Sequence, residues 1–447
     1  MGSEMCIRDS LYELTMMAGY FTAGFMPAAT FELYVRELPP NRSYLIAAGL
    51  DQVLDYLEHL RFTTADVEHL RTVPALRGVR SDFFDEYLPR FRFTGEVWAV
   101  EEGTPIFPPA PLLRVTAPLP EAQLIETAVL AHIGFQTSVA SRAARIVHAA
   151  AGRAVVEFGA RRAHGPEAAV LAARAAFLSG CASTSNVEAG RRFGIPVSGT
   201  MAHSWVMAMS DELSAFQQYA AVFGDEAVLL LDTYDPIEAA RSIVKSGLHP
   251  RSVRLDSGDL IALSRRVRNI LDEGGLADTR IFTSGDLDEW RIHDIISDGA
   301  PVDGFGVGAA LTTVSDAPSL GAIYKLVEID RDGVTVPVMK HSVGKPTLPG
   351  RKQVWRVFED NVATEDLIEH VREGVDVPSA VPLLRRAMSG GKRDIDALAL
   401  SELRSRSKAA LAAIPERVRR IHHPEPYRVR FGPALRAAVE RFATKNS

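Results

Sequence analysis

A repeating pattern of short apolar runs between residues 155 and 308 constrains the fold of this chain more than any other feature. The runs recur roughly every 20–30 residues, and each ends in glycine, hydroxyl-bearing or charged residues. Helical patterns fill several of the gaps, as at 167–178, 236–246 and 260–273. Strands that alternate with helices in this way are typical of a parallel sheet covered by helices. We therefore expect an α/β fold built on a parallel α/β barrel, with an open doubly wound sheet as the alternative.

The distinctive polar residues of the chain follow these apolar runs. In a parallel barrel the carboxyl ends of the strands lie at one edge, and the functional groups come from the loops at that edge. We therefore expect a single constellation from the segments that follow seven runs, namely 161–162, 181–186, 198–205, 232–235, 256–259, 283–286 and 306–308. Helix capping alone would not concentrate arginines, carboxylates and glycines in successive loops.

The residue types in these loops suit an anionic, phosphorylated substrate. Arg161, Arg162 and Arg254 supply fixed positive charge, which binds carboxylates and phosphates in a bidentate manner. The carboxylates are hard oxygen ligands of the kind that holds Mg²⁺ beside phosphates, and they are Asp232, Asp256, Asp259 and Asp286. Backbone N–H groups in Ser284–Asp286 and Gly306–Ala310 can cradle a phosphate. The set is typical of a site for a Mg²⁺-bound phosphorylated sugar and a small anionic partner.

One histidine, His203, lies in a loop of small and hydroxyl-bearing residues at 198–205. Gly199 and Thr200 precede it, and the loop follows a short apolar run that ends at Val197. Such a loop brings backbone N–H groups, hydroxyls and a titratable nitrogen to one place, which favours phosphate chemistry. A loop histidine without a special role is the ordinary alternative.

Other kinds of site lack their sequence signatures. The chain has no Gly-x-x-x-x-Gly-Lys-Ser/Thr loop and no Gly-x-Ser-x-Gly elbow. An isomerase or aldolase on a similar barrel would need a Schiff-base lysine or an acid–base pair at the strand ends. Lys325 is the only obvious lysine near a strand end, so this class is not favoured. His422 and His423 lie in a charged tail and are expected at the surface.

Composition bounds the remaining classes. The chain of 447 residues has a net charge of −6, which gives no electrostatic footprint for nucleic acid. Its two cysteines, Cys6 and Cys181, are too few for a disulfide framework, and this favours a reducing, cytoplasmic setting. No apolar run approaches the roughly 18–20 residues that cross a bilayer, so we expect no membrane segment. Residues 1–10 show no signal-peptide or transit-peptide pattern.

The chain is long enough for two or three domains. We expect a smaller N-terminal α/β domain with a β-rich module, the barrel, and a C-terminal extension, with bounds of 1–135, 136–335 and 336–447. In the first of these, residues 11–26 and 45–60 are predicted to be helical and residues 29–38 to form a strand. Thr63 to Asp66 is typical of a helix cap. The tail at 377–447 is predicted to be helical and charged, with an arginine-rich, solvated face.

Taken together, the motifs resemble those of the nicotinate phosphoribosyltransferase family. The matching segments occur in family order and are 11–16, 157–162, 183–186, 199–204, 254–259, 306–308 and 344–350. The resemblance implies an irregular α/β barrel of the type II phosphoribosyltransferase kind, in a homodimer. It also implies that nicotinate reacts with phosphoribosyl pyrophosphate to give nicotinate mononucleotide and pyrophosphate. ATP hydrolysis would be coupled to this reaction through a phosphohistidine at His203, and Mg²⁺ would be the metal.

The resemblance further implies roles for individual residues. Tyr12 would stack on the nicotinate ring across the dimer interface, while Arg161 and Arg254 would lie at the pyridine carboxylate and the sugar phosphates. Asp256 joins His203 and Arg254 in the expected catalytic set, and with Asp232 it would hold the metal through pyrophosphate. The other expected substrate-binding residues are Ser185, Gly199, Thr200, Ser284, Gly285, Gly306 and Gly308.

Two positions depart from the family pattern. Asp9-Ser10 stands where the family has Thr-Asp, and Ala309 stands where a threonine is usual. The alternatives left open are a nicotinamide or quinolinate phosphoribosyltransferase and a catalytically decayed relative that only binds metabolites. A cationic pocket favours an acid over an amide, and quinolinate enzymes are usually shorter chains.

Overall fold

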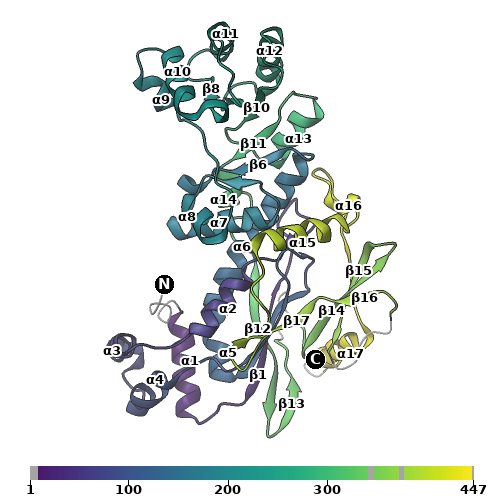
Figure 1. The fold of residues 1–447 in the computed structure, drawn as a ribbon. Helices are drawn as coiled ribbons and strands as arrows, with labels where there is room; N and C mark the ends of the chain where they lie inside the picture. The colour runs from purple at the N-terminus through teal and green to yellow at the C-terminus, as the bar shows by residue number, and fades with distance from the viewer. Residues whose placement is uncertain (1–8, 341–346, 372–376, 445–447) are drawn as a thin grey trace.

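Two large sheets, stacked along the length of the molecule, form the body of the protein (Figure 1). The computed structural model describes residues 9–340, 347–371 and 377–444. The long helix α6 (Glu126–Ala149) runs between the two sheets, and a smaller sheet lies beside the lower one. Buried apolar side chains form two clusters, one around each large sheet. Helix α6 contributes to both, with Val129 and Ile133 in one cluster and Val139 and Ile146 in the other.

Seven strands form the lower sheet, and all neighbours in it are antiparallel. Their order across the sheet is β13 (Val334–Pro337), β12 (Ala322–Arg331), β1 (Ala28–Val35), β5 (Pro111–Pro118), β3 (Glu96–Val100), β17 (Leu384–Ser389) and β18 (Lys392–Arg393). Strand β1 is almost wholly buried and hydrogen-bonds to β5 on one side and β12 on the other. Residues beyond 135 and beyond 335 thus help to build this sheet, which does not follow the contiguous bounds expected from sequence.

Helices and turns pack around the lower sheet. They are α1 (Leu11–Thr22), α2 (Leu50–His59), α3 (Thr64–Thr72), η2 (Pro74–Leu76), η3 (Phe83–Tyr87), α4 (Leu88–Arg90) and α5 (Leu119–Leu124). The predicted cap at Thr63 is confirmed, because Thr63 and Asp66 form a capping box. The prediction that the helix at 45–60 starts at residue 45 was wrong. Residues 45–46 form β2 (Leu45–Ile46) with β4 (Pro105–Ile106), and Gly49 has a φ of 99°, so α2 begins at Leu50.

Six parallel strands form the upper sheet. Their order is β7 (Ser183–Thr184), β6 (Ala154–Glu157), β11 (Gly304–Val307), β10 (Arg280–Thr283), β9 (Ser252–Leu255) and β8 (Val228–Leu230). The last strand along the chain, β11, pairs with the first, β6, as in a barrel rather than in a doubly wound sheet. Beyond β7 a single parallel bridge joins Thr184 to Val197, and among the described residues no pairing connects Val197 to β8. The predicted irregular parallel α/β barrel is confirmed, and it is open on one side.

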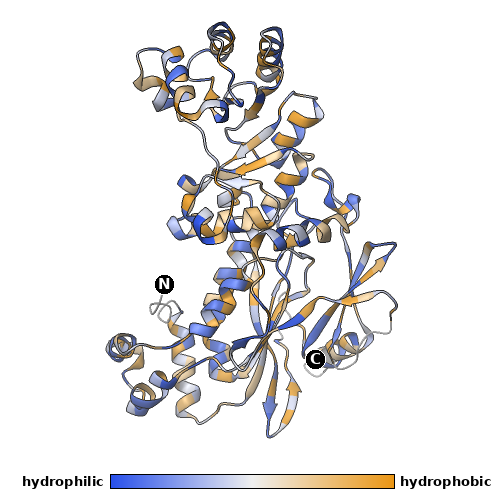
Figure 2. Ribbon diagram, viewed as in Figure 1, coloured by the Kyte–Doolittle hydropathy of each residue, from blue (hydrophilic) through white to orange (hydrophobic). Residues whose placement is uncertain are grey.

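Helices fill the connections between these strands. They are α7 (Pro166–Leu178), α8 (Val187–Phe193), α9 (His203–Ala208), α10 (Glu212–Phe223), α11 (Pro236–Ser246), α12 (Leu260–Glu273), α13 (Glu289–Ser297) and α14 (Ala309–Thr313), with turns η4 (Ala160–Arg162) and η5 (Gly224–Glu226). Helix α11 buries Ile237, Ala240 and Ile243 against the sheet, and its polar residues face outward. Figure 2 shows apolar and polar residues mixed along α11 and α12, as amphipathic surface helices require.

The C-terminal part differs from the predicted helical tail. It contains the strands β14 (Lys352–Glu359), β15 (Val362–His370), β16 (Ala380–Pro382) and β19 (Arg428–Phe431), and the helices α15 (Leu400–Ala412), α16 (Glu416–Arg419) and α17 (Pro433–Thr444). The prediction was wrong for β16, β17, β18 and β19. In β17 a register shift after Arg386 breaks the alternation of buried and exposed residues, so the strand does not show the period of two that marks one in a sequence.

Candidate active site

Three charged or hydroxyl side chains meet where β9 and β10 end. Arg254, near the end of β9, donates hydrogen bonds from Nη2 to Asp256 Oδ1 at 2.6 Å and from Nε to Ser284 Oγ at 2.7 Å. The Ser284 hydroxyl in turn donates to Asp256. The guanidinium also lies 5.6 Å from the centre of the Phe158 ring. These contacts hold the arginine in one orientation, with its side chain 14% exposed.

Asp256 is ionised at neutral pH because of its neighbours. Burial opposes ionisation, but the hydrogen bond from Ser284 and the charge of Arg254 outweigh it. They hold the pKa of Asp256 below its ordinary value of 3.8. A carboxylate that stays ionised beside a fixed guanidinium can orient a cation or a metal-bound anion.

His203 lies within reach of this group. It is the first residue of α9, and its side chain is 42% exposed. Its Nε2 lies 3.7 Å from Asp256 Oδ2, and its Nδ1 lies 3.2 Å from the Thr233 hydroxyl. The two ring nitrogens therefore have different partners: Nδ1 faces a hydroxyl that can fix the tautomer, and Nε2 faces the open edge of the sheet beside a carboxylate.

Asp232 completes the cluster from the end of β8. Its Oδ2 accepts hydrogen bonds from the backbone N–H of Asp256 at 3.0 Å and from the Ser257 hydroxyl. Its Oδ1 is buried and has no hydrogen-bond partner among the described residues. A buried carboxylate oxygen without a donor is unfavourable on its own. The two carboxylates therefore fit a Mg²⁺ ion, which prefers oxygen ligands.

Glycines allow the backbone to pack closely around this cluster. Gly285 has a φ of +91°, and a Cβ there would lie 1.8 Å from the carbonyl oxygen of Asp256. A Cβ on Gly306 would lie 2.6 Å from the Phe158 ring. Gly308, the residue before α14, is less constrained, because the nearest atom to its Cβ would be 3.6 Å away. The close backbone packing around the cluster therefore requires glycine at positions 285 and 306.

The remaining expected residues lie at the same edge of the sheet. Arg161 is exposed in η4, directly after β6, and no ion pair within the described ranges involves it. Ser185 follows β7, and its backbone N–H bonds to the carbonyl of Glu157 at 3.0 Å. Gly199 is exposed, and Thr200 is half-buried in the loop before α9. Within the described residues, the side chains of Arg161, Ser185 and Thr200 make no hydrogen bond or ion pair with the cluster around Asp256.

Glu157 lies in the 157–162 motif, but no role in the site was predicted for it from the sequence. It ends β6 and is 1% exposed. It accepts hydrogen bonds from the Thr184 hydroxyl at 2.6 Å, the Thr312 hydroxyl at 3.2 Å and the backbone N–H of Gly159. One carboxylate thereby connects the loops that carry Arg161 and Ser185 to the helix that follows Gly308.

Comparisons with known proteins show to which family the chain belongs. Residues 7–134, 154–373 and 369–438 match, in turn, the N-terminal domain, the main family and the C-terminal domain described for nicotinate phosphoribosyltransferase (NAPRTase). The nicotinate phosphoribosyltransferase PncB2 of Mycobacterium tuberculosis H37Rv is 46% identical over 390 residues, covering 86% of this chain and 81% of that protein. The chain belongs to the nicotinate phosphoribosyltransferase family. This is a family of enzymes, as the sequence motifs predicted.

Two further relatives extend the comparison. A nicotinate phosphoribosyltransferase of Bacillus subtilis is 43% identical over 368 residues, covering 80% of this chain and 74% of that one. The crystal structure of human nicotinic acid phosphoribosyltransferase superposes with a TM-score of 0.85 at 28% identity. The match covers 97% of this chain and 99% of the human one. The nicotinate phosphoribosyltransferase fold therefore extends over nearly all of the chain.

One element of the family pattern lies away from the described site, and another lies partly outside the described residues. Tyr12 is 47% exposed on α1, which packs on α5, η2 and η3 at the opposite end of the molecule from α9 (Figure 1). A single nicotinate phosphoribosyltransferase chain therefore does not bring Tyr12 to His203. Residues 344–346 of the 344–350 motif lie outside the described residues, as do residues 1–8.

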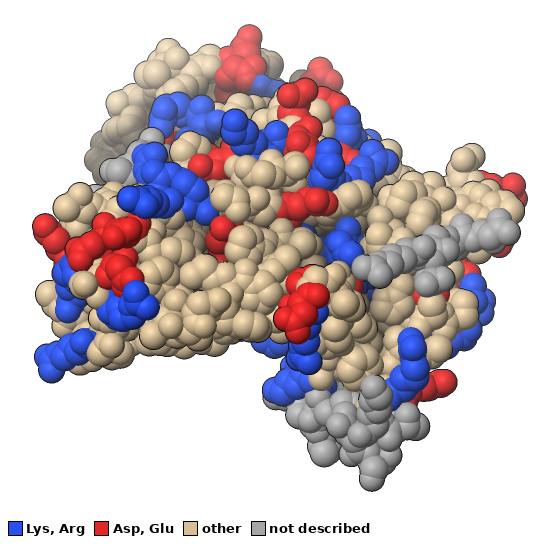
Figure 3. All heavy atoms as spheres, turned by 90° about the horizontal axis from the view of Figure 1, so that it is seen from below, with Lys and Arg blue, Asp and Glu red and all other residues tan. Residues whose placement is uncertain are grey.

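In the part of the chain that the structure describes, neither the charge on one face nor the length of the helices indicates a further kind of partner for this nicotinate phosphoribosyltransferase chain. On the face seen in Figure 3, lysine and arginine are interleaved with aspartate and glutamate, and neither sign of charge dominates. Within the described residues, no helix combines the length and apolar character needed to cross a membrane.

Proposed function

We propose that this chain joins the pyridine nitrogen of nicotinate to the anomeric carbon of phosphoribosyl pyrophosphate, a step in NAD biosynthesis. The products are nicotinate mononucleotide and pyrophosphate. Family membership supports this assignment. The observation that carries it is the meeting of Arg254, Asp256, Asp232 and His203 at the carboxyl ends of neighbouring parallel strands.

The reaction needs charge around the leaving group more than it needs a strong base. The bond between the anomeric carbon and pyrophosphate breaks, and its electron pair leaves with the pyrophosphate. The nicotinate nitrogen supplies the electron pair of the new bond. Arg254, fixed by Asp256 and Ser284, lies ready to stabilise negative charge on the phosphates. Mg²⁺, when held by Asp232 and Asp256, would neutralise part of the charge of the pyrophosphate.

Nicotinate is the pyridine substrate that the arginines favour. Arg161 is exposed at the same edge and has no carboxylate partner in the described part of the chain, so its guanidinium is available to the substrate carboxylate. An uncharged amide would lose this charge-assisted pairing. Nicotinamide and quinolinate remain as alternative substrates to be compared directly.

ATP enters this proposal through His203. The imidazole Nε2 would attack the γ-phosphorus of ATP, forming an N–P bond while the bond to the bridging oxygen breaks and ADP leaves. Water would later take the phosphoryl group to give inorganic phosphate. The Thr233 hydroxyl, 3.2 Å from Nδ1, would keep the proton on that nitrogen and leave the Nε2 lone pair free.

A homodimer would complete the site. Tyr12 is exposed on α1 and lies far from the barrel loops of its own chain. In a two-fold dimer, α1 of one protomer can approach the barrel of the other, and the tyrosine ring can then stack on nicotinate. Exposed apolar side chains on α1 and around α9, including Leu11 and Met207, support a protein contact in these regions.

The deciding experiment incubates the protein with nicotinate, phosphoribosyl pyrophosphate and Mg²⁺, with and without ATP, and measures nicotinate mononucleotide by chromatography. We expect product in both reactions and stimulation by ATP. His203→Ala should abolish the stimulation and the transfer of radiolabel from γ-labelled ATP to the protein, because the phosphoryl acceptor is gone.

His69→Ala is the matched control, since His69 is an exposed histidine on α3 at the other end of the molecule. It should behave as wild type. Unchanged ATP coupling in His203→Ala would refute the phosphohistidine. A wild-type protein that releases no pyrophosphate with nicotinate, nicotinamide or quinolinate would show a binding protein instead of an enzyme.

A further inference from the structure

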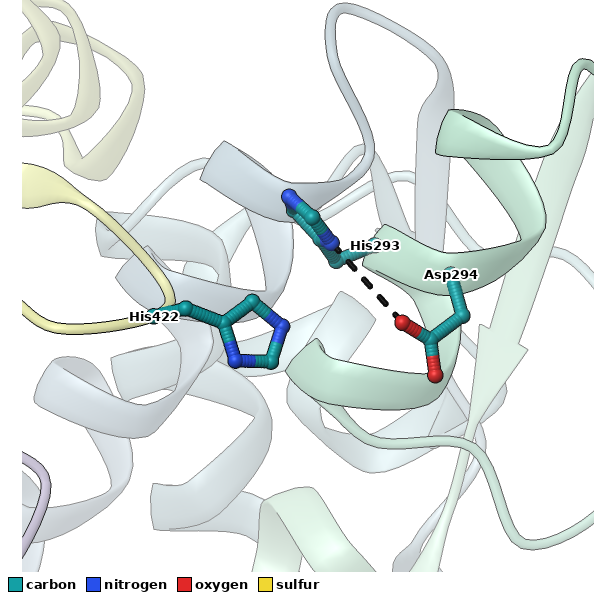
Figure 4. Close-up of side chains that lie close together, drawn as sticks. All are labelled: His293, Asp294 and His422. Atoms are coloured by element: carbon teal, nitrogen blue, oxygen red, sulfur yellow. Dashed lines mark ion pairs between the residues drawn. The ribbon is translucent and has the colours of Figure 1, made fainter.

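Two histidines and one aspartate from distant parts of the chain gather on the outside of the barrel (Figure 4). His293 and Asp294 lie on α13, and His422 lies on the loop that follows α16. The close-up shows the imidazole of His422 reaching across from the C-terminal loop toward the two side chains on the helix. None of the three belongs to the site at the carboxyl ends of the strands.

The side chains are already close to a shared position. One potential ligand atom from each of the three residues lies within 4.8 Å of the other two. His293 Nδ1 is 3.9 Å from Asp294 Oδ1, and the rings of His293 and His422 pack edge to face with their centres 4.8 Å apart. The side chains of His293 and Asp294 are 40% and 59% exposed, so they can rotate without disturbing a packed core.

We propose that His293, Asp294 and His422 form a binding site for a divalent transition-metal ion of the zinc class. Two imidazole nitrogens and one carboxylate oxygen are a usual donor set for Zn²⁺, with water in the open position. Bonds of roughly 2.0–2.2 Å would draw the three ligand atoms closer together than they are now, through side-chain rotation. The nitrogen ligands distinguish this site from the oxygen-only pair Asp232 and Asp256, which suits Mg²⁺.

A hydroxyl next to the cluster contacts the first ligand. The Ser297 hydroxyl lies 3.4 Å from His293 Nδ1, one helical turn further along α13. In the metal-free protein this contact orients the ring of His293, and an ion bound at Nδ1, the nitrogen that faces Asp294, would replace it.

The bound ion would clamp α13 to the C-terminal segment. Helix α13 starts directly after the loop that carries Ser284 and Gly285, but its first residue, Glu289, is already held by buried arginines, including Arg142 and Arg145. The active-site end of the helix is therefore fixed without the ion. We expect the metal to raise the stability of the folded protein by mass action and to leave the catalytic rate unchanged.

Calorimetric titration of the EDTA-treated, dialysed 447-residue chain with ZnCl₂ tests the proposal. His422→Ala and Asp294→Asn should each weaken one Zn²⁺-binding event by about tenfold or more. His423→Ala is the matched control, because it removes the neighbouring exposed histidine, which is not in the cluster. Circular dichroism of each variant confirms the fold.

The same variants should lose the rise in melting temperature that Zn²⁺ gives the wild type. Equal Zn²⁺ affinity in His422→Ala, His423→Ala and wild type would overturn the proposal, and the two rings would then only pack against each other. Zn²⁺ binding that is lost in Asp232→Asn but kept in His422→Ala would overturn it as well, by placing the ion among the catalytic carboxylates.

Discussion

At the scale of single residues, Glu157 determines how three loops of the site are arranged. Its carboxylate is buried and bonds to Thr184, Thr312 and Gly159. Burial raises its pKa above the ordinary value of 4.5, although all three hydrogen bonds act in the opposite direction. At pH values above this raised pKa the folded state therefore bears the full penalty for the ionised form. The penalty declines as the pH falls below the raised pKa and is gone below the ordinary value of 4.5.

Glu157→Gln should lower kcat/KM for nicotinate by about tenfold or more, because small displacements of positioning groups are costly to catalysis. The amide offers one acceptor and one donor group, so it cannot accept all three hydrogen bonds, and the loops that carry Arg161 and Ser185 should shift. The melting temperature should stay close to that of wild type, since the substitution also removes the penalty for a buried charge.

Steady-state kinetics and thermal unfolding of the same samples check this prediction. Glu157→Asp keeps the carboxylate and should recover part of the activity. A parallel fall in activity and melting temperature in Glu157→Gln would show that the residue only holds the fold together.

The sequence could not reveal the role of Glu157, because its side-chain partners are far away along the chain. Thr184 and Thr312 are 27 and 155 residues distant. The group around Asp256 was easier to predict, since Arg254 is two residues away and the other members follow apolar runs. Tyr12 shows the limit of this approach: its place in the motif is clear, but a single chain does not bring it near the barrel loops.

At the scale of elements, the loop between β10 and α13 depends on a glycine. Gly285→Ala should destabilise the protein by roughly 1–3 kcal/mol and reduce activity strongly, because alanine disfavours a φ of +91° and its Cβ would meet the carbonyl of Asp256. Chemical denaturation and product assays measure the two effects.

Gly134→Ala is the matched control for that substitution. Gly134 lies within α6, and a Cβ there would meet no atom within 4 Å. The same chemical change should therefore stabilise the protein by about 0.5–1 kcal/mol, through the higher helix propensity of alanine. Destabilisation of similar size in both variants would mean that the conformation of the loop is not the cause.

Two helices around the barrel, α11 and α12, were predictable because each is amphipathic and starts at a clear cap. The predicted bounds at 236–246 and 260–273 are those of α11 and α12, whose caps are Asp235 and Asp259. The C-terminal strands were not predictable in this way. On one side strand β17 pairs with β3, which is more than 280 residues earlier, and a register shift after Arg386 masks its period of two.

At the scale of the whole molecule, the position of Tyr12 predicts complementation between inactive variants. If each site takes its barrel from one protomer and Tyr12 from the other, Tyr12→Ala mixed with His203→Ala should form heterodimers with one intact site. With random exchange of subunits, about half of the dimers are mixed and each has one intact site of two. About a quarter of the ATP-coupled activity of wild type should therefore return. The measurement is product formation after mixing, unfolding and refolding the two variants together.

Each variant refolded alone is the control and should stay inactive in the coupled assay. Light scattering gives the oligomeric state of the mixture. Mixed dimers that recover no activity would place Tyr12 outside the partner's site.

Helix α6 has a consequence for how the chain can be divided. It supplies buried side chains to both hydrophobic clusters, so its two ends belong to different cores. A cut near residue 135 would fall inside this helix and leave an unpartnered apolar stripe on each fragment. Neither half can then be an independent folding unit. If one hydrophobic cluster unfolds, the other loses the α6 side chains that pack against it. The three family domains follow one another along the sequence, but we expect thermal unfolding of the chain to show a single cooperative transition.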